Sequence, residues 1–422
     1  MDIRHDLLSF LDAAIQVVEG KQVVEQALPE IVKNQPDDSL SDTNALADMQ
    51  IVAIGKAAES MLQGAFSYLE GITITNPKAL LISKTGHISP ESYQNPAINC
   101  IESAHPVPDE TSLVAGQSLI TFLQSSEAPC LFLISGGTSS LVEVLNEDWS
   151  LQELQEITQW MLANAYSIEQ INSVRCRISS IKAGGLWRYL GNRKAICLMI
   201  SDVPDDDVRV IGSGLLFPEK QRTHSNEIPN SLPEHWKQKL SPSITTKANK
   251  DFYWKVIASN TQAKNGAAKL AKQKGYAVQT IQELQQGLAV EVAKHCVQMA
   301  KENPNTVMIW GAETTVILPE SVGRGGRNQH LALAAAIELQ GLDNAFLLSA
   351  GTDGTDGVTD DAGAIVDGQS LNRAAVDGYL AKSSLKQADS GYFLCASGDL
   401  ISTGVTGTNV MDVIIAFVSD KG

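Results

Sequence analysis

Short apolar runs alternate with amphipathic segments along most of this chain of 422 residues. This alternation predicts strands joined by helical crossovers, which is typical of α/β folds with parallel sheets. Helices are expected after Gly55 and over Leu113–Leu123, Leu151–Ile168, Gln262–Lys274, Leu288–Lys301 and Gln329–Leu339. The expected strands are Gln50–Ile54, Ala79–Ser83, Asn99–Ser103, Cys130–Ile134, Ala195–Ser201, Trp254–Ser259, Tyr276–Gln279, Thr306–Trp310, Thr315–Leu318, Ala345–Ser349 and Asp412–Val418.

The length favours two domains rather than one. Pro218–Lys250 is polar and contains several prolines, so it is the best candidate linker. We therefore predict a Rossmann-like α/β domain with a largely parallel sheet over residues 1–240, and a second α/β domain over residues 250–422. The first residues, MDIRHDLLSFLDAAIQVVEG, have the spacing of an amphipathic helix and lack the features of a signal peptide.

Charge and hydropathy exclude several classes of partner. The chain has 32 basic and 48 acidic residues and a net charge of -16, which would repel nucleic acid and anionic membranes. No apolar run is long enough to span a bilayer. The 6 cysteines are dispersed and form no CxxC pair, which is typical of reduced thiols in a cytoplasmic protein. The sequence is compatible with a homodimer.

The segment Leu347–Gly368 places Asp353, Asp356, Asp360 and Asp361 on one glycine-rich loop after an apolar strand. Crowded carboxylates repel, so charge from outside the segment must compensate them. Either a cation such as Mg²⁺ or basic residues from elsewhere in the chain would serve. A solvated surface loop is the alternative.

Other glycine-rich or polar turns follow predicted strands, where open α/β sheets bind ligands. IVAIGK places Lys56 at the start of a helix, where backbone N–H groups favour an anion. LFLISGGTSS presents Ser135, Gly136 and Gly137, whose main-chain donors suit a phosphate or carboxylate. Further candidates are Asp202 after a strand, His105 in SAHPVPDE, Arg324 and Arg327 in GRGGRN, and the segment Thr403–Asn409.

Several common motifs are absent from the sequence: the P-loop, the dinucleotide GxGxxG turn, the protein-kinase set, the GxSxG elbow and zinc-ligand spacings. Lysine, arginine, main-chain amides and an aspartate-rich loop suit phosphoryl transfer, which depends on positioning and charge neutralisation.

The ordered segments VAIGKAA, AHPVPDE, LISGGTSSL, INSVR with SSIKAGG, SDVPDDD, GAETTV, GRGGRNQ, GTDGTDG and TGTNVMD resemble the glycerate 2-kinases. That family pairs an N-terminal kinase domain with a C-terminal MOFRL domain. The resemblance implies an active site between domains and phosphorylation of D-glycerate at its 2-hydroxyl, with ATP and Mg²⁺. It also implies catalytic roles for Lys56 and Arg327.

Several positions depart from the family pattern. Thr138 replaces a glycine, Cys176 replaces a basic residue, and Gly185 stands where arginine is usual. Asp205, Leu215, Ala312 and His330 are further departures. We expect phosphate and metal handling to survive these changes, whereas the acceptor acid is more open to change than the reaction.

The resulting expectation has three parts. The ATP phosphates lie near Ser135, Gly136 and Gly137, with Arg324 and Asn328 as further phosphate ligands. Arg175 or Lys182 binds the substrate carboxylate, and Mg²⁺ is held by one or more of Asp202, Asp353 and Asp356. Three alternatives remain: a kinase of another small hydroxy acid, a hydroxypyruvate oxidoreductase, and a metabolite sensor without catalysis.

Overall fold

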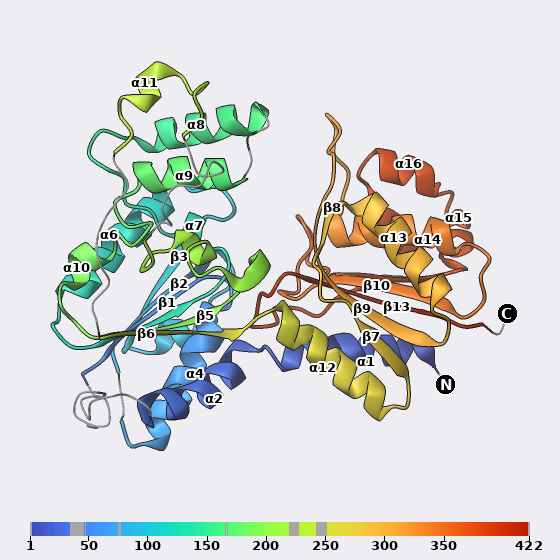
Figure 1. Ribbon diagram of the computed structural model, residues 1–422, viewed down its shortest axis with the longest axis horizontal. Helices are drawn as coiled ribbons and strands as arrows, with labels where there is room; N and C mark the ends of the chain where they lie inside the picture. Colours follow the sequence, from blue (N-terminus) through green and yellow to red (C-terminus); the bar gives the residue numbers. More distant parts are fainter. Residues whose placement is uncertain are drawn as a thin grey trace. The chain divides into compact units, whose positions relative to one another are not determined.

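The computed structural model describes residues 2–33, 46, 48–74, 77–164, 166, 168–218, 228–241 and 251–420. Much of the predicted linker Pro218–Lys250 lies outside these residues. The chain forms two compact units (Figure 1). We call Gly20–Ile257 the first unit, and Met1–Glu19 together with Ala258–Gly422 the second unit. None of the described helices is long and apolar enough to cross a membrane.

The first unit contains a sheet of the order β3-β2-β1-β4-β5-β6. Strands β1 to β5 pair in parallel, so the predicted α/β fold with a parallel sheet is confirmed. The strands are β1 Gln50–Ile54, β2 Ala79–Lys84, β3 Ile98–Ser103, β4 Cys130–Ile134, β5 Ala195–Ile200 and β6 Phe252–Ala258. Strands β1, β4 and β5 are buried throughout, which explains why their sequences are apolar except for Gln50 at the start of β1.

Helices cover both faces of this sheet. Figure 1 shows α2 (Gly20–Lys33) and α4 (Ala58–Gly71) on one face, and α6 (Glu110–Gln124) and α10 (Trp187–Leu190) on the other. From the central pair β1 and β4, the chain proceeds outward in opposite directions, to β2 and β3 and to β5. The carboxyl ends of β1 and β4 therefore form a topological switch point, the usual ligand-binding position of such sheets.

A helical subcluster lies beside this sheet, made of α8 (Leu151–Ala163), α9 (Ile168–Ile178) and α11 (Glu234–Lys237). Its buried core includes Leu154, Val174 and Trp236. The single helix predicted over Leu151–Ile168 is wrong, because α8 ends at Ala163 and Asn164 caps it. The first unit also contains the short helices α5 (Pro90–Gln94) and α7 (Thr138–Leu141).

The second unit contains a mixed sheet of the order β12-β11-β10-β13-β9-β7, with β8 also paired to β9. Strands β9 to β13 pair antiparallel along this order, whereas β7 and β8 run parallel to β9. The strands are β7 Ala277–Thr280, β8 Gln285–Leu288, β9 Thr306–Thr315, β10 Ala345–Gly351, β11 Gly363–Asp367, β12 Leu400–Ile401 and β13 Asp412–Val418. The strand predicted over Thr306–Trp310 is confirmed as part of β9, whereas the separate strand predicted over Thr315–Leu318 is wrong, because β9 itself continues to Thr315 and ends there.

Helices α13 (Ala289–Glu302) and α14 (Arg327–Leu339) lie on one face of the second sheet, and α1 (Ile3–Gln16) and α12 (Asn260–Gln273) on the other (Figure 1). The buried core includes Trp310, Leu331 and Ile414. Three short helices, α15 (Ser370–Ala375), α16 (Ala381–Lys386) and α17 (Ser390–Ser397), pack near α14.

The compact units differ from the predicted ranges 1–240 and 250–422 at two segments. Helix α1 packs in the second unit, because Asp6 accepts hydrogen bonds from Lys274 Nζ at 2.5 Å and from Tyr276 Oη at 2.6 Å. Phe10 also packs edge-on against Tyr276. Strand β6 joins the first sheet beside β5, so that sheet extends past residue 250.

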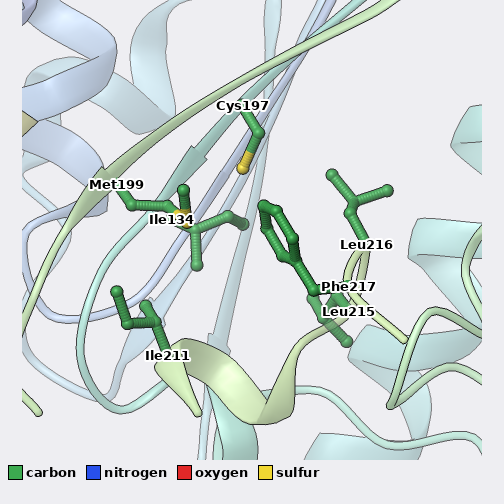
Figure 2. Close-up of a pocket in the computed structure, with 7 residues that line it drawn as sticks. All are labelled: Ile134, Cys197, Met199, Ile211, Leu215, Leu216 and Phe217. Carbon is green, nitrogen blue, oxygen red and sulfur yellow. The ribbon is translucent and has the colours of Figure 1, made fainter. Parts of the chain in front are cut away.

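A cavity of about 10 Å³ lies in the core of the first unit, among side chains from β4, β5 and the loop that follows β5 (Figure 2). It is lined by Ile134, Cys197, Met199, Ile211, Leu215, Leu216 and Phe217. A space of this size holds at most one water molecule, which needs polar partners to stay. Because the lining is apolar, we interpret the cavity as a packing gap rather than a ligand site.

Candidate functional site

The turn after β1 interlocks with the turn after β4. Gly55 has a φ of +128°, and a Cβ built on it would lie 2.2 Å from Ser135 Oγ, so only glycine fits there. Lys56 N donates to Gly136 O at 2.9 Å. Ala57 N donates to Ser135 Oγ at 3.1 Å. The sheet topology therefore brings together two motifs that lie far apart in sequence.

Ser135, Gly136 and Gly137 form the turn itself. Ser135 is fully buried, its hydroxyl accepts from Ala57 N, and its backbone N donates to Ile54 O at 3.0 Å. The candidate donors to an anion in this turn are therefore the backbone N–H groups of Gly136 and Gly137. Thr138 Oγ1 lies 2.9 Å from Ile54 O and 2.7 Å from Ser135 O. Thr138 therefore fastens this turn to the end of β1.

His105 lies beside the same turn. A Cβ built on Gly137 would be 3.1 Å from His105 Cδ2, 3.3 Å from His105 Nε2 and 3.4 Å from Lys56 Cγ. The imidazole and the lysine side chain are thus neighbours across Gly137. The sequence indicated His105 by its position after a strand, but it contained no reason to pair it with Lys56.

Asp202 follows β5, as His105 follows β3 and Lys56 follows β1. Because these strands are parallel, their carboxyl ends lie at one edge of the sheet. Asp202 is partly buried, whereas Asp207 forms an ion pair with Arg209 at 2.6 Å. Lys56, His105, the Ser135–Gly137 turn and Asp202 therefore share the ligand-binding edge that this topology defines.

The two residues predicted to bind the substrate carboxylate, Arg175 and Lys182, differ in environment. Arg175 in α9 is partly exposed, and its Nη2 donates to Ser139 O at 3.2 Å, beside the turn after β4. Lys182 is 0% exposed and forms an ion pair with Glu143, whose side chain is 1% exposed. Burial lowers the pKa of Lys182, and Glu143 acts against that effect. Arg175 is therefore the better placed to reach a substrate.

In the second unit, the guanidinium of Arg327 lies between two carboxylates. Nε and Nη2 donate to Asp412 at 2.6 and 3.0 Å. Nη1 and Nη2 donate to Glu313 at 2.5 and 3.1 Å. Burial opposes the charged form of Arg327, but Asp412 and Glu313 outweigh it and raise the pKa of the guanidinium. The sequence did not indicate Glu313 or Asp412 as partners of this arginine.

Asp356 and Asn328 lie at the amino-terminal end of α14. Asp356 accepts hydrogen bonds from Asn328 N at 3.1 Å and Gln329 N at 2.8 Å, which satisfies backbone groups that a helix leaves unpaired. Burial raises the pKa of Asp356 to about 7, although the two backbone hydrogen bonds act to lower it. Asn328 is 2% exposed and accepts from Ser349 Oγ at 2.7 Å. Both side chains hold α14 against the end of β10.

Arg324 holds the acidic loop. Its Nη2 lies 3.1 Å from Asp361 Oδ2, and its backbone N donates to Asp389 at 2.8 Å. Arg324, a basic residue from outside the loop, therefore supplies part of the positive charge that the carboxylates of the loop require. The segment 403–409 supports the loop from another side, because Thr406 Oγ1 donates to Thr352 O at 2.6 Å.

The predicted metal ligands do not form a group by themselves. Among the described residues, no group of three or more His, Cys, Asp or Glu side chains could hold an ion. The carboxylate of Asp356 is engaged with the start of α14, which does not suit a metal ligand. Asp353 is partly buried, and its Oδ1 accepts from Thr355 N at 3.1 Å. Since Mg²⁺ needs only one or two carboxylates when phosphates complete its shell, either Asp202 in the first unit or Asp353 in the second suits that role better than Asp356.

Comparison with known proteins agrees with this architecture. Residues 6–246 match the family model described as a domain of unknown function (DUF4147), and residues 306–412 match the MOFRL family. The crystal structure of a glycerate kinase from Thermotoga maritima superposes with a TM-score of 0.80 and 32% sequence identity, covering 99% of both chains.

Sequence relatives point to the same class. The D-glycerate 2-kinase of Thermotoga maritima is 34% identical, covering 92% of this chain and 97% of the relative. The glycerate 2-kinase of Pyrococcus horikoshii is 30% identical, covering 100% of this chain and 98% of the relative. The fold and the relatives define an enzyme of the small-molecule kinase class. The chain belongs to the glycerate 2-kinase family, as the resemblance predicted.

Proposed function

We propose that this protein phosphorylates D-glycerate at the 2-hydroxyl, with ATP as the phosphoryl donor. The observation that carries the proposal is the full-length similarity to a D-glycerate 2-kinase, at 34% identity. The interlocked Lys56 and Gly136 turns support it, because a lysine and main-chain amides at a strand-to-helix edge suit an anionic substrate.

In the first unit, the proposed catalytic residue is Lys56, whose ammonium neutralises charge on the transferring phosphoryl group. The amides of Gly136 and Gly137 bind phosphate oxygens. Arg175 binds the substrate carboxylate, for which its planar guanidinium offers two parallel N–H donors. Lys182 is a weaker candidate for this role because it is fully buried against Glu143.

In the second unit, the proposed catalytic residue is Arg327, which stabilises the charge that develops on the phosphoryl oxygens. Asn328 supports it by holding the start of α14. Arg324 fixes the acidic loop through Asp361 and Asp389, so its contribution to phosphate binding is mainly indirect.

Magnesium is proposed to accompany ATP. When bound, it would neutralise phosphate charge, with Asp202 or Asp353 as the protein carboxylate that could hold it. Asp356 is the weakest of the three predicted ligands, because its oxygens accept hydrogen bonds from α14. A cytoplasmic location and a homodimer remain predictions, to be tested by cell fractionation and light scattering.

One assay separates this proposal from its alternatives. The purified protein is incubated with ATP, Mg²⁺ and D-glycerate, tartronate or lactate, and the products are resolved by ³¹P NMR. We expect 2-phosphoglycerate and ADP from D-glycerate. Phosphorylation of a different acid would make the enzyme a kinase of another substrate. NAD(P)H-dependent reduction of hydroxypyruvate without ADP formation from any acid would contradict the proposal.

The role of Arg327 has its own test. Arg327→Lys should lower kcat by ~10³-fold, because an ammonium cannot reproduce the two-pronged contact of a guanidinium. Arg373→Lys is the matched control, since Arg373 also lies between two carboxylates in the second unit. Nearly unchanged turnover in Arg327→Lys would remove this arginine from the mechanism.

A further inference from the structure

Arg327 has no complete donor edge left for a phosphate in this structure. A guanidinium carries five N–H donors and binds a phosphate or carboxylate through two of them in parallel. The four hydrogen bonds to Asp412 and Glu313 occupy both of its paired edges. Hence Arg327 cannot act on a phosphoryl group by a two-pronged contact unless one carboxylate moves away.

The two carboxylates differ in how firmly they are held. The side chain of Asp412 is 2% exposed, whereas that of Glu313 is 35% exposed. The backbone of Asp412 is also fixed, because Asn260 Nδ2 donates to Asp412 O at 3.0 Å and to Val410 O at 2.9 Å. Moving Asp412 would leave a carboxylate unpaired in the core, whereas Glu313 can turn toward solvent.

We propose that Glu313 is an exchangeable partner of Arg327: it holds the guanidinium in the nucleotide-free enzyme and yields its place to a phosphate of ATP. Asp412 stays bound to Nε and Nη2 throughout and positions the guanidinium. This inference rests on the proposed function, since it takes the phosphate of ATP as the incoming anion.

The exchange follows from charge and geometry. A phosphate offers oxygens that match the Nη1 and Nη2 edge as a carboxylate does, and it carries more negative charge. In the absence of ATP, Glu313 prevents a half-buried cation from remaining without its second partner. Glu313 therefore opposes ATP binding by competition while it keeps the free enzyme ordered.

The molecule contains a matched control for this arrangement. Arg373 pairs with Asp367 at 2.9 and 3.1 Å and with Asp399 at 2.7 Å. Its side chain is 37% exposed, Asp367 is 18% exposed, and Asp399 is 1% exposed. This cluster also has a more exposed and a buried carboxylate around an arginine, and neither belongs to the proposed machinery. It differs in that Arg4 also pairs with Asp367 at 3.5 Å and with Asp399 at 3.0 Å.

The test is calorimetric titration of ATP with Mg²⁺ into wild type, Glu313→Gln and Asp367→Asn. The Glu313→Gln substitution keeps the length of the side chain but leaves it uncharged with one acceptor oxygen, so it releases the guanidinium edge more readily. We expect Glu313→Gln to lower the Kd for ATP by about 3- to 10-fold, the scale of one partly exposed ion pair. Asp367→Asn should leave the Kd unchanged.

A general effect of removing one negative charge must be separated from local exchange. Asp360→Asn removes an exposed carboxylate from the acidic loop, and its effect on ATP binding should be small and screened by salt. The effect of Glu313→Gln should persist at high ionic strength. Equal Kd values for Glu313→Gln and wild type, or weaker ATP binding by Glu313→Gln, would overturn the exchange.

Asp412→Asn tests which carboxylate stays. We expect it to lower kcat without tightening ATP binding, because it leaves Arg327 poorly oriented. Tightening equal to that of Glu313→Gln would show that the roles are assigned wrongly. If this buried substitution prevents folding, the comparison of Glu313→Gln with Asp367→Asn and Asp360→Asn still decides whether Glu313 exchanges with ATP. Wild type that binds ATP but does not phosphorylate glycerate would contradict the proposed acceptor and not the exchange.

Discussion

Lys182 and Glu143 form an ion pair in the first unit in which neither side chain is more than 1% exposed. Lys182 follows α9, and Glu143 follows α7, so the pair joins two segments that flank the predicted anion-binding turn. Burying two charges costs free energy, but removing only one partner of a buried pair costs more, because the other charge is left unpaired. Because both side chains are buried, the pair favours a structural role for Lys182 over a role in binding substrate.

Lys182→Met should destabilise the protein by about 3–5 kcal/mol, because it leaves Glu143 buried without its partner. Combining it with Glu143→Leu should recover most of that loss. Denaturant unfolding of the single and double variants measures both effects. A double variant that is stable but has a greatly increased KM for glycerate would instead support the role of Lys182 as a substrate ligand.

His105→Asn should lower kcat/KM by about tenfold or more, the scale of one well-placed hydrogen bond to a charged group. The reason is the position of His105 against Gly137 and beside Lys56. His295→Asn is the control, since His295 is exposed on α13. Steady-state kinetics with varied ATP and varied glycerate would show which substrate is affected. Equal kinetics of the two variants would mean that His105 only fills space beside the turn.

Asp353→Asn should weaken the response of ATP binding to Mg²⁺ more than it alters the melting temperature. The reason is that a neutral amide is a poorer ligand for Mg²⁺ than a carboxylate. Calorimetric titrations of ATP with and without Mg²⁺ measure this, and Asp360→Asn on the same loop is the control. The same metal dependence in wild type and Asp353→Asn would leave Asp202, or the phosphates alone, to hold the ion.

His330 makes stability depend on pH. It is 7% exposed, and burial lowers its pKa below the ordinary value of 6.5. Below pH 6.5, the unfolded chain binds a proton that the folded protein does not, so the free energy of unfolding falls as the pH falls toward the folded-state pKa. His330→Gln should lose this contribution, whose slope is at most about 1.4 kcal/mol per pH unit. Urea unfolding of both proteins at about pH 5, 6 and 7 measures the difference, and parallel curves would contradict the expectation.

Local sequence patterns determined much of the fold. The positions of β1, β4 and β13 follow from their apolar runs, because a strand buried on both faces is mostly apolar. Gln50 and Asp412, the first residues of β1 and β13, are buried polar exceptions. The turn at Gly55 was likewise predictable, since a glycine and a lysine between a strand and a helix are a local signal. These features depend on residues that are adjacent in the chain, so they can be recognised from the sequence alone.

Contacts between distant segments required the tertiary structure. Arg327 pairs with Glu313, 14 residues away, and with Asp412, 85 residues away, and no local pattern indicates either partner. The acidic loop suggested Asp356 as a metal ligand, yet it lies at the start of α14. Lys182 was a candidate ligand for the substrate, but packing buried it against Glu143. The sequence by itself determined which groups can bind anions, whereas folding decided which of them are engaged by other groups of the protein, because that depends on which strands and helices meet.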